Sequence, residues 1–366
     1  MADLRLEKLA KVLVNYSLAI QPGETFLLKG PAVAAPLIKE IYREALRAGA
    51  HVTTLISIEG TKEIFFNEAN EEQLQYVSPF AEFQINHYDT QLMIIADENT
   101  KALSGTDPKK QAAHSAAQAG ISKRFMERSA SNELRWSLTL YPTQAHAMDA
   151  GMSLSEYEDF VFSAGYLDQE DPVAAWEKVQ QEQQRIADYL DKHHEIHIVA
   201  PGTDITYHVG GRKWISCSGD KNFPDGEVFT GPIEDSANGY VNFSYPAVYN
   251  GNEVENVRLV FKDGKVVESS ADRGEDFLNA MLNMDAGSRY LGEVAFGLNY
   301  NVKRFTKEIL FDEKIGGTMH MALGAGFPET GSTNDSGLHW DMVCDLHEGK
   351  VYADGELCYE NGKFII

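Results

Sequence analysis

The first 165 residues or so alternate between segments with the hydrophobic period of a helix and short apolar runs typical of strands. An amphipathic helix is predicted near the N-terminus by the spacing of its apolar residues, Leu6, Leu9, Ala10 and Leu13. A similar period fills residues 35–48 and predicts a second helix. Strands are predicted at residues 25–30, 51–58, 91–97 and 136–143, and the run at 91–97 is apolar enough to be buried on both faces. Strands that alternate with helices predict a largely parallel sheet.

Three further helices are predicted from the same periodicity. Residues 61–77 and residues 109–128 each carry a helical pattern. Residues 171–194 form the longest pattern, with Asp171 as the expected N-cap and Pro172 at the first helical position. This helix is polar on one face, and we interpret it as a bridge between domains.

The second half of the chain has a different sequence pattern, which predicts mainly antiparallel β structure. The segments EIHIVA and ITYHV flank a PGTD turn, which indicates a hairpin. Three pairs have the residues preferred in tight type I′ hairpin turns: Asp263-Gly264, Asp354-Gly355 and Asn361-Gly362. A length of 366 residues favours two domains. We therefore expect an α/β protein with an N-terminal α/β domain over residues 1–190, including the bridging helix, and a β-rich α+β domain over residues 191–366.

Composition and charge limit the partners and the compartment. With 32 basic and 55 acidic residues the net charge is −23, which repels phosphate backbones and anionic lipids, so no nucleic-acid or membrane partner is expected. The three cysteines show no CxxC spacing, which argues against a disulfide framework and fits a reducing cytoplasm. The N-terminal stretch carries scattered charges unlike a signal peptide, and there is no run of eighteen apolar residues. We expect a cytoplasmic protein.

Candidate chemistry concentrates in four stretches of the second half. NFPDGEVFTGP contains Glu227, and LGEVAFGLN contains Glu293. DEKIGGTMHMALG contains Glu313 and His320, and LHWDMVCDL contains His339 and Asp341. In a strand, residues i and i+2 point to the same face, so the last pair would project side by side while Trp340 points the opposite way.

Each of these residues has an ordinary structural explanation when it is taken alone. Glu227 fits a solvated turn carboxylate, Glu293 a charge at a strand edge, and His320 a core histidine with satisfied hydrogen bonds. His339 and Asp341 fit a buried hydrogen-bonded pair. Together they supply the mixed nitrogen and oxygen ligands that a pair of Zn²⁺, Co²⁺ or Mn²⁺ ions needs, with Mg²⁺ also compatible and no thiolate required.

The four stretches resemble the signature segments of the M29 metallopeptidases, the aminopeptidase T family. KLAKVLVNYSLAIQPGE, REALRAGAH, LTLYPTQAHA and GMSLSEYEDFVFSA resemble the N-terminal domain of the same family, so the match runs in order over nearly the whole chain. The resemblance implies a metal-dependent aminopeptidase that acts on short peptides. It also implies two divalent metal ions per chain in the C-terminal domain, and a homodimer that encloses an internal chamber.

The resemblance also implies which residues hold the metals. Matched position by position, the ligands are Glu227, Glu293, His320, His339 and Asp341. Glu313 aligns with an acid near the site and is an additional candidate. Glu293 is the first candidate for the bridging ligand or the general base, followed by Glu227, and the sequence does not separate these roles. One position departs from the family, because Phe327 stands where a tyrosine is usual, seven residues after the first histidine. If the hydroxyl of that tyrosine assists the transition state, its absence affects the rate or the substrate range but not the metal site.

Two other functions remain open on the sequence. A non-haem iron oxygenase is suggested by the His-x-Asp spacing, although its third ligand would have to be His347, only six residues after Asp341. A non-catalytic metal-binding protein is suggested by Phe327. A serine hydrolase of the α/β type is not supported, because no GxSxG motif is present.

Overall fold

Two compact units make up the chain in the computed structural model, which describes residues 3–249 and 251–366. The first unit runs to Val173 and includes Asp220–Phe223, and the second comprises Ala174–Gly219 and Pro224–Ile366. The sequence placed the division after residue 190. In the structure nearly all of α10 (Pro172–Leu190) groups with the second unit, because Ile186, Ala187 and Leu190 pack into the core of that unit.

The first unit is built on a parallel sheet, which confirms the predicted α/β arrangement. Its strand order is β2-β1-β3-β4-β8, and every neighbouring pair is parallel. The strands are β1 (Thr25–Pro31), β2 (His51–Ser57), β3 (Thr90–Ile95), β4 (Arg135–Leu140) and β8 (Asn222–Phe223). The short β8 comes from the second half of the chain and was not predicted. The expectation that the run at 91–97 is buried on both faces was wrong, because Met93 is 46% exposed.

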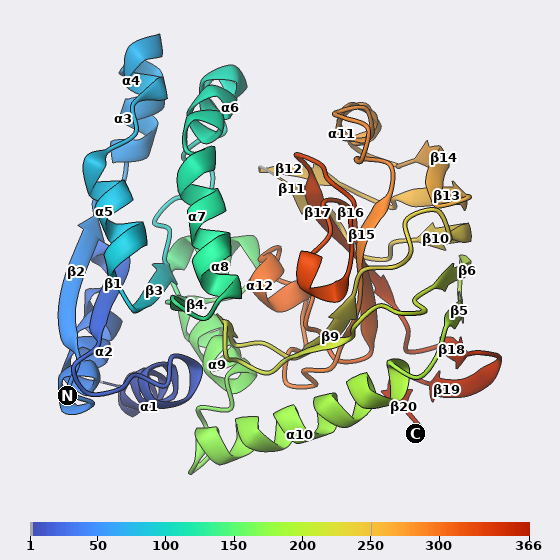
Figure 1. The fold of residues 1–366 in the computed structure, drawn as a ribbon, viewed down its shortest axis with the longest axis horizontal. Helices are drawn as coiled ribbons and strands as arrows, with labels where there is room; N and C mark the ends of the chain where they lie inside the picture. The colour runs from blue at the N-terminus through green and yellow to red at the C-terminus, as the bar shows by residue number, and fades with distance from the viewer. Residues whose placement is uncertain (1–2, 250) are drawn as a thin grey trace. The chain divides into compact units, whose positions relative to one another are not determined.

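The first unit also contains helices, and two of the predicted helices are each divided in two. The helix predicted over 61–77 is two helices, because Asn70 forms a capping box with Gln73 and starts a new helix after the first has ended. The helix predicted over 109–128 is also divided in two. The helices are α1 (Leu4–Val12), a π-helical turn (Leu13–Ser17), a 3₁₀ turn (Ala32–Ala34), α2 (Ala35–Arg47), α3 (Thr61–Glu68), α4 (Glu71–Gln75), α5 (Pro79–His87), α6 (Pro108–Ala117), α7 (Ala119–Ala130), α8 (Gln144–Asp149) and α9 (Leu154–Ala164). In Figure 1, α3 to α5 follow one another as one column and α6 and α7 form a second.

The second unit contains antiparallel sheets, as predicted. The eight-stranded sheet has the order β14-β13-β10-β6-β5-β18-β19-β20, and the five-stranded sheet has the order β17-β16-β15-β9-β7. The first sheet contains β5 (Glu195–Ala200), β6 (Thr203–His208), β10 (Asn238–Asn242), β13 (Arg258–Lys262), β14 (Lys265–Ser270), β18 (Lys350–Ala353), β19 (Glu356–Glu360) and β20 (Lys363–Phe364). The second contains β7 (Ile215–Cys217), β9 (Glu227–Thr230), β15 (Leu291–Gly297), β16 (Thr318–Gly324) and β17 (His339–Asp345). A two-stranded sheet (β11, Ala247–Tyr249; β12, Asn252–Val254), α11 (Glu275–Leu282), α12 (Ile309–Asp312) and a 3₁₀ turn (Pro328–Thr330) complete the unit.

The predicted hairpins of the second unit are confirmed. β5 pairs with β6 across the PGTD turn. Both residues of each predicted Asp-Gly or Asn-Gly pair have positive φ, as a type I′ turn requires.

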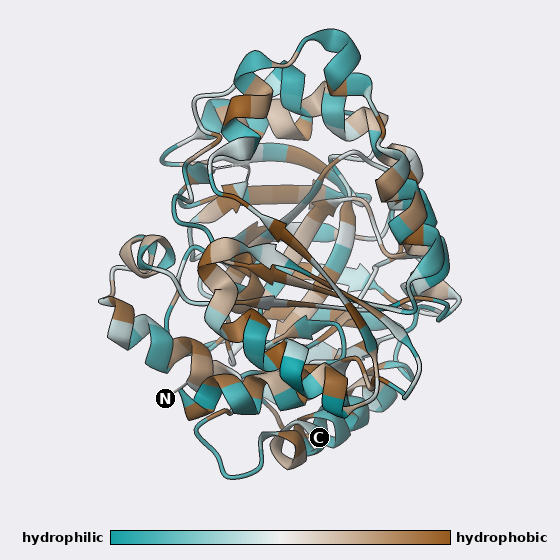
Figure 2. Ribbon diagram, turned by 90° about the vertical axis from the view of Figure 1, so that its left-hand side faces the viewer, coloured by the Kyte–Doolittle hydropathy of each residue, from teal (hydrophilic) through white to brown (hydrophobic). Residues whose placement is uncertain are grey.

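Brown and teal bands alternate along the helices in Figure 2, which is the amphipathic pattern that the sequence predicts. No helix within the described ranges is long and apolar enough to cross a membrane.

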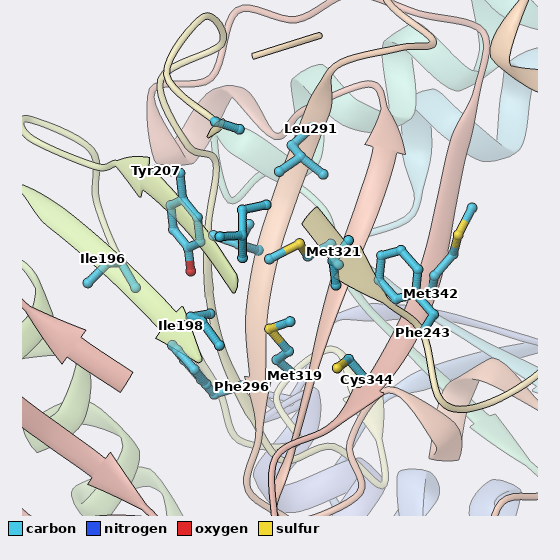
Figure 3. Packing of buried hydrophobic residues seen from close by; sticks show 14 of the residues in the cluster. Ile196, Ile198, Tyr207, Phe243, Leu291, Phe296, Met319, Met321, Met342 and Cys344 are labelled. Carbon is cyan, nitrogen blue, oxygen red and sulfur yellow. The ribbon is translucent and has the colours of Figure 1, made fainter. Parts of the chain in front are cut away.

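The hydrophobic core of the second unit lies on one face of the five-stranded sheet. Alternate residues of its central strands are buried there, among them Val294, Phe296, Met319, Met321, Trp340 and Met342. Figure 3 shows several of these side chains gathered with Ile196, Ile198 and Tyr207 from the eight-stranded sheet. Burying each large apolar side chain stabilises the fold by roughly 1.5–3 kcal/mol. The opposite face of the same strands is therefore free to carry polar side chains.

Candidate metal centre

The predicted ligands lie on four adjacent strands of the five-stranded sheet. Glu227 is the first residue of β9, and the others are Glu293 on β15, His320 on β16, and His339 and Asp341 on β17. The register places Ala322 of β16 directly between Glu293 and Asp341. Since a strand alternates its faces, the ligands share the face opposite to the core, and the small side chain at position 322 leaves space between them. The sheet thus brings together residues from four separate stretches of sequence.

Each imidazole is oriented by a backbone carbonyl. His320 Nδ1 lies 3.1 Å from the carbonyl oxygen of Glu313, and His339 Nδ1 lies 2.8 Å from that of Ala325. A carbonyl oxygen can only accept, so in both residues Nδ1 carries the proton and donates it. The Nε2 atoms are left facing the carboxylates. A hydrogen bond of this kind, from the ring nitrogen that does not bind the ion, is usual for histidines that ligate metals.

The separations within the cluster match those expected of ligands around shared ions. Glu293 directs one oxygen to each imidazole, with Oε1 3.3 Å from His320 Nε2 and Oε2 3.4 Å from His339 Nε2. Glu227 Oε2 lies 3.4 Å from His320 Nε2, and Asp341 Oδ2 lies 3.6 Å from His339 Nε2. Ligand atoms about 2.0–2.2 Å from one ion in tetrahedral geometry are roughly 3.3–3.6 Å apart. These gaps are long for hydrogen bonds and suitable for an ion.

Three overlapping groups of side chains bring possible ligand atoms within 4.8 Å of one another on this face. The groups are Glu227 with Glu293 and His320, Glu293 with His339 and Asp341, and Glu313 with His320 and Asp341. Glu293 is shared by the first two groups, and each of these groups contains one imidazole. The arrangement can hold cations at two neighbouring positions joined by Glu293.

The electrostatics of the cluster favour positive charge. Burial opposes protonation of His320, but Glu293 and Glu227 outweigh it and raise the pKa of the imidazole to about 10. Burial acts against His339 in the same way, and Asp341 and Glu293 raise its pKa to about 10. Burial alone would raise the pKa of Glu293, yet its contacts with the two imidazoles lower it to about 2. A divalent cation would replace the protons that these carboxylates otherwise attract.

Two buried oxygens of the cluster lack hydrogen-bond partners within the described part of the chain: Glu227 Oε2 and Asp341 Oδ1. Orphaned buried acceptors are rare, because desolvating an oxygen without a partner is costly. Both atoms face the imidazoles at the ion-like separations given above or slightly longer, with Asp341 Oδ1 4.0 Å from His320 Nε2. The residues present therefore fit a divalent metal site.

Three side chains beside the cluster were not predicted from the sequence. The side chain of Lys314 is 1% exposed, and its Nζ lies 2.5 Å from Glu227 Oε1, 2.6 Å from Glu313 Oε1 and 3.3 Å from Asp225 Oδ1. Burial opposes its charge, but these carboxylates hold the pKa of Lys314 well above its ordinary value. Asp225 and Cys217 form a fourth group of possible ligand atoms with Glu227. The only sequence signal was a charged DEK triplet just before a buried strand.

The aromatic ring of Phe327 contacts the imidazole of one candidate ligand, His339. Its ring lies edge-on to the imidazole of His339, with centroids 5.1 Å apart, and also against Phe229 at 5.4 Å. The loop that carries it is tied down at Glu234, which accepts hydrogen bonds from the backbone N–H and the hydroxyl of Thr333. The position at which the family usually carries a tyrosine is therefore adjacent to a candidate ligand.

Two other histidines of the second unit, one of which is the third ligand that an iron oxygenase would need, lie in different surroundings. His347 is exposed and lies 2.6 Å from Asp345, and His197 contacts Asp204 at 2.8 Å. Among the described residues, no group of possible ligand atoms contains His347. The oxygenase alternative thus gains no third ligand from the structure.

Comparisons with known proteins identify the family to which the chain is similar. Residues 2–364 match the model of the family described as thermophilic metalloprotease (M29). The chain is 32% identical to Aminopeptidase 2 of Geobacillus stearothermophilus, over 97% of this chain and 95% of that protein. It is 28% identical to Aminopeptidase T of Thermus thermophilus, over 96% of this chain and 95% of that protein. The solved structure of wild-type AmpT from Thermus thermophilus superposes with a TM-score of 0.88 at 25% identity, and the match covers 99% of both chains.

Proposed function

The chain belongs to the M29 family of metalloproteases, and we propose that it is an aminopeptidase that removes N-terminal residues from short peptides with two cocatalytic metal ions. The observation that carries this proposal is the position of Glu293. Its two oxygens face two separate imidazoles at 3.3 and 3.4 Å, and each imidazole has a further carboxylate beside it.

We assign one metal position to Glu227, Glu293 and His320, and the other to Glu293, His339 and Asp341. Glu313 is an additional candidate ligand through its group with His320 and Asp341. Oxygen and nitrogen donors without a thiolate suit Zn²⁺, Co²⁺ or Mn²⁺, and Mg²⁺ is also compatible. The main chain supports the imidazoles, because their Nδ1–H groups are held by the carbonyls of Glu313 and Ala325.

In hydrolysis the protein supplies orientation and proton transfer. Bound divalent ions lower the pKa of a water molecule and polarise the scissile carbonyl. Glu293 is our first candidate, and Glu227 the second, for either the ligand that both ions share or the carboxylate that accepts the proton of the water and returns it to the leaving amine. Both carboxylates are more than nine-tenths buried, so neither is solvated in the way a surface carboxylate would be.

Blocking the N-terminus of a peptide should separate an aminopeptidase from other hydrolases. Acetylation removes the charge of the α-amine and adds bulk where the substrate should end. Leaving the groups that bind the amine without a partner costs several kcal/mol of transition-state binding. We therefore expect acetylated peptides to be cleaved at least about 10²-fold less efficiently in kcat/KM than free peptides of the same sequence.

The experiment is a panel of free and acetylated peptides, with products identified by mass spectrometry and metal content measured on the same sample. Free peptides should lose one residue at a time from the N-terminus. Internal cleavage of a blocked peptide at a comparable rate would contradict the aminopeptidase proposal while leaving the metal site intact. No hydrolysis by fully metal-loaded protein would favour the non-catalytic alternative.

Phe327→Tyr tests whether the hydroxyl usual in the family matters in this chain. If that hydroxyl donates to the developing oxyanion, the substitution should raise kcat by at most about 10²–10³-fold. Phe305→Tyr is a suitable control, because Phe305 is also half-buried but stacks on Tyr245. Steady-state kinetics of the two variants provide the measurement. Equal kcat in both would mean that the hydroxyl at position 327 is not used.

Two further properties are proposed, the first from the family resemblance and the second from the cysteines. We propose that the protein is a homodimer that encloses an internal chamber, which light scattering coupled to size-exclusion chromatography would test. We also propose a cytoplasmic location. It is supported by the absence of any disulfide among the three cysteines, all of which lie in the described residues.

A further inference from the structure

Lys314 is a buried charge that the proposed mechanism does not use. Among the largest fully buried side chains of the described residues, it is the only charged one. It lies just after α12, and its backbone N–H donates to the carbonyl of Phe311. Burying an ammonium group is very costly unless it is paired, so a lysine at this depth requires the carboxylates around it.

The ammonium of Lys314 contacts one carboxylate oxygen of the candidate ligand Glu227, and the other oxygen faces an imidazole. It contacts Oε1 of Glu227, while Oε2 of the same carboxylate faces His320 Nε2 at 3.4 Å. It also contacts Oε1 of Glu313, whose carboxylate belongs to the group with His320 and Asp341. With Oε1 of Glu227 held by an ammonium, Oε2 is the oxygen left for a metal ion.

Lys314 also occupies a place where a cation could otherwise bind. Its Nζ contacts Glu227 and Asp225, which form a group of possible ligand atoms with Cys217. The carboxylates that contact Lys314 or belong to the cluster of candidate ligands are Asp225, Glu227, Glu293, Glu313 and Asp341. Five carboxylates and one ammonium give a formal charge of −4, which two divalent ions neutralise. Without the ammonium the charge would be −5, and two such ions would leave one carboxylate uncompensated.

We propose that Lys314 is a positioning residue of the metal centre: a built-in cation that fills a third cation position and fixes which oxygens of Glu227 and Glu313 face the two ions. This assignment rests on the proposed two-metal function. The assignment predicts that loss of the ammonium changes the number and the coordination of the bound ions, while the packing on the core face of the sheet stays unchanged.

The test compares wild-type protein, Lys314→Ala and a control, Lys350→Ala, whose lysine pairs with Glu360 at the surface. Each protein is stripped of metal, checked by circular dichroism and titrated with Co²⁺, and the bound ion is measured by mass spectrometry and visible absorption. Wild type and control should bind two equivalents with the same spectrum. Lys314→Ala should bind a third equivalent and show a changed Co²⁺ spectrum, because three carboxylates lose their cation. Its kcat should fall at least about tenfold at full occupancy.

A folded Lys314→Ala protein that binds two equivalents with the wild-type spectrum would overturn the assignment. If this variant does not fold, the double variant Lys314→Gln with Asp225→Asn replaces the ion pair by neutral groups of similar size. An unchanged spectrum in the double variant would overturn the assignment equally, and a changed one would support it. Wild-type protein that binds fewer than two equivalents would instead refute the two-metal centre, and the role of Lys314 with it.

Discussion

Glu293→Gln is expected to lower kcat by at least about 10³-fold with little change in the fold. Glutamine has nearly the same shape, so the packing of β15 should survive. The amide, however, carries no charge and offers only one oxygen, whereas Glu293 directs an oxygen to each of two imidazoles. If Glu293 is the shared ligand, one of the two metal positions would lose a ligand; if it is the general base, the proton acceptor would be absent. Steady-state kinetics and metal analysis on the same preparation measure both effects.

His339→Ala is expected to lower kcat by a factor of the same order, for a different reason. It removes a nitrogen ligand from the second position only, so fewer than two ions per chain should stay tightly bound. Suitable controls are Glu268→Gln and His208→Ala, because both side chains are exposed on strands of the other sheet. Turnover close to wild type in both Glu293→Gln and His339→Ala would rule out the proposed ligand roles.

The two faces of the five-stranded sheet could be predicted from the sequence. In TMHMALG the residues Met319 and Met321 alternate with His320, and the structure places the methionines in the core and the imidazole on the opposite face. The same alternation sets Trp340 apart from His339 and Asp341, as predicted. Alternation is local physics, because successive side chains of any strand point to opposite faces. The turn pairs with positive φ were predictable for the same reason.

Features that depend on distant contacts could not be predicted in this way. Periodicity does not give the strand order β17-β16-β15-β9, which brings four stretches into one cluster; the family resemblance suggested the ligand residues but not this order. The two-residue strand β8 has no hydrophobic signature of its own. The burial of Lys314 depends on Asp225 and Glu227, which lie far away in the sequence, so no local pattern indicates it. By contrast, the cap at Asn70 was a local signal that the helical periodicity obscured.

Removal of the metal ions is expected to abolish peptide hydrolysis while leaving the fold largely intact. Every proposed ligand is an oxygen or nitrogen donor, so a chelator should compete for the ions effectively. The core of the second unit lies on the opposite face of the sheet and does not include the ligands. The backbone hydrogen bonds that orient His320 and His339 also do not require an ion. The far-ultraviolet circular dichroism spectrum should therefore change little.

Stability should nevertheless fall, because the ions bind the folded state and the ligands are scattered along the unfolded chain. Each ion present at a hundredfold excess over its Kd stabilises the folded protein by about 2.7 kcal/mol, so chelation should lower the Tm measurably. Addition of Co²⁺ or Zn²⁺ to the stripped protein should restore both the Tm and the activity. Full activity in a sample shown to contain no metal would refute the site. Recovered Tm without recovered hydrolysis would leave a metal-binding protein that has lost catalysis, and Phe327 would then be the first position to examine.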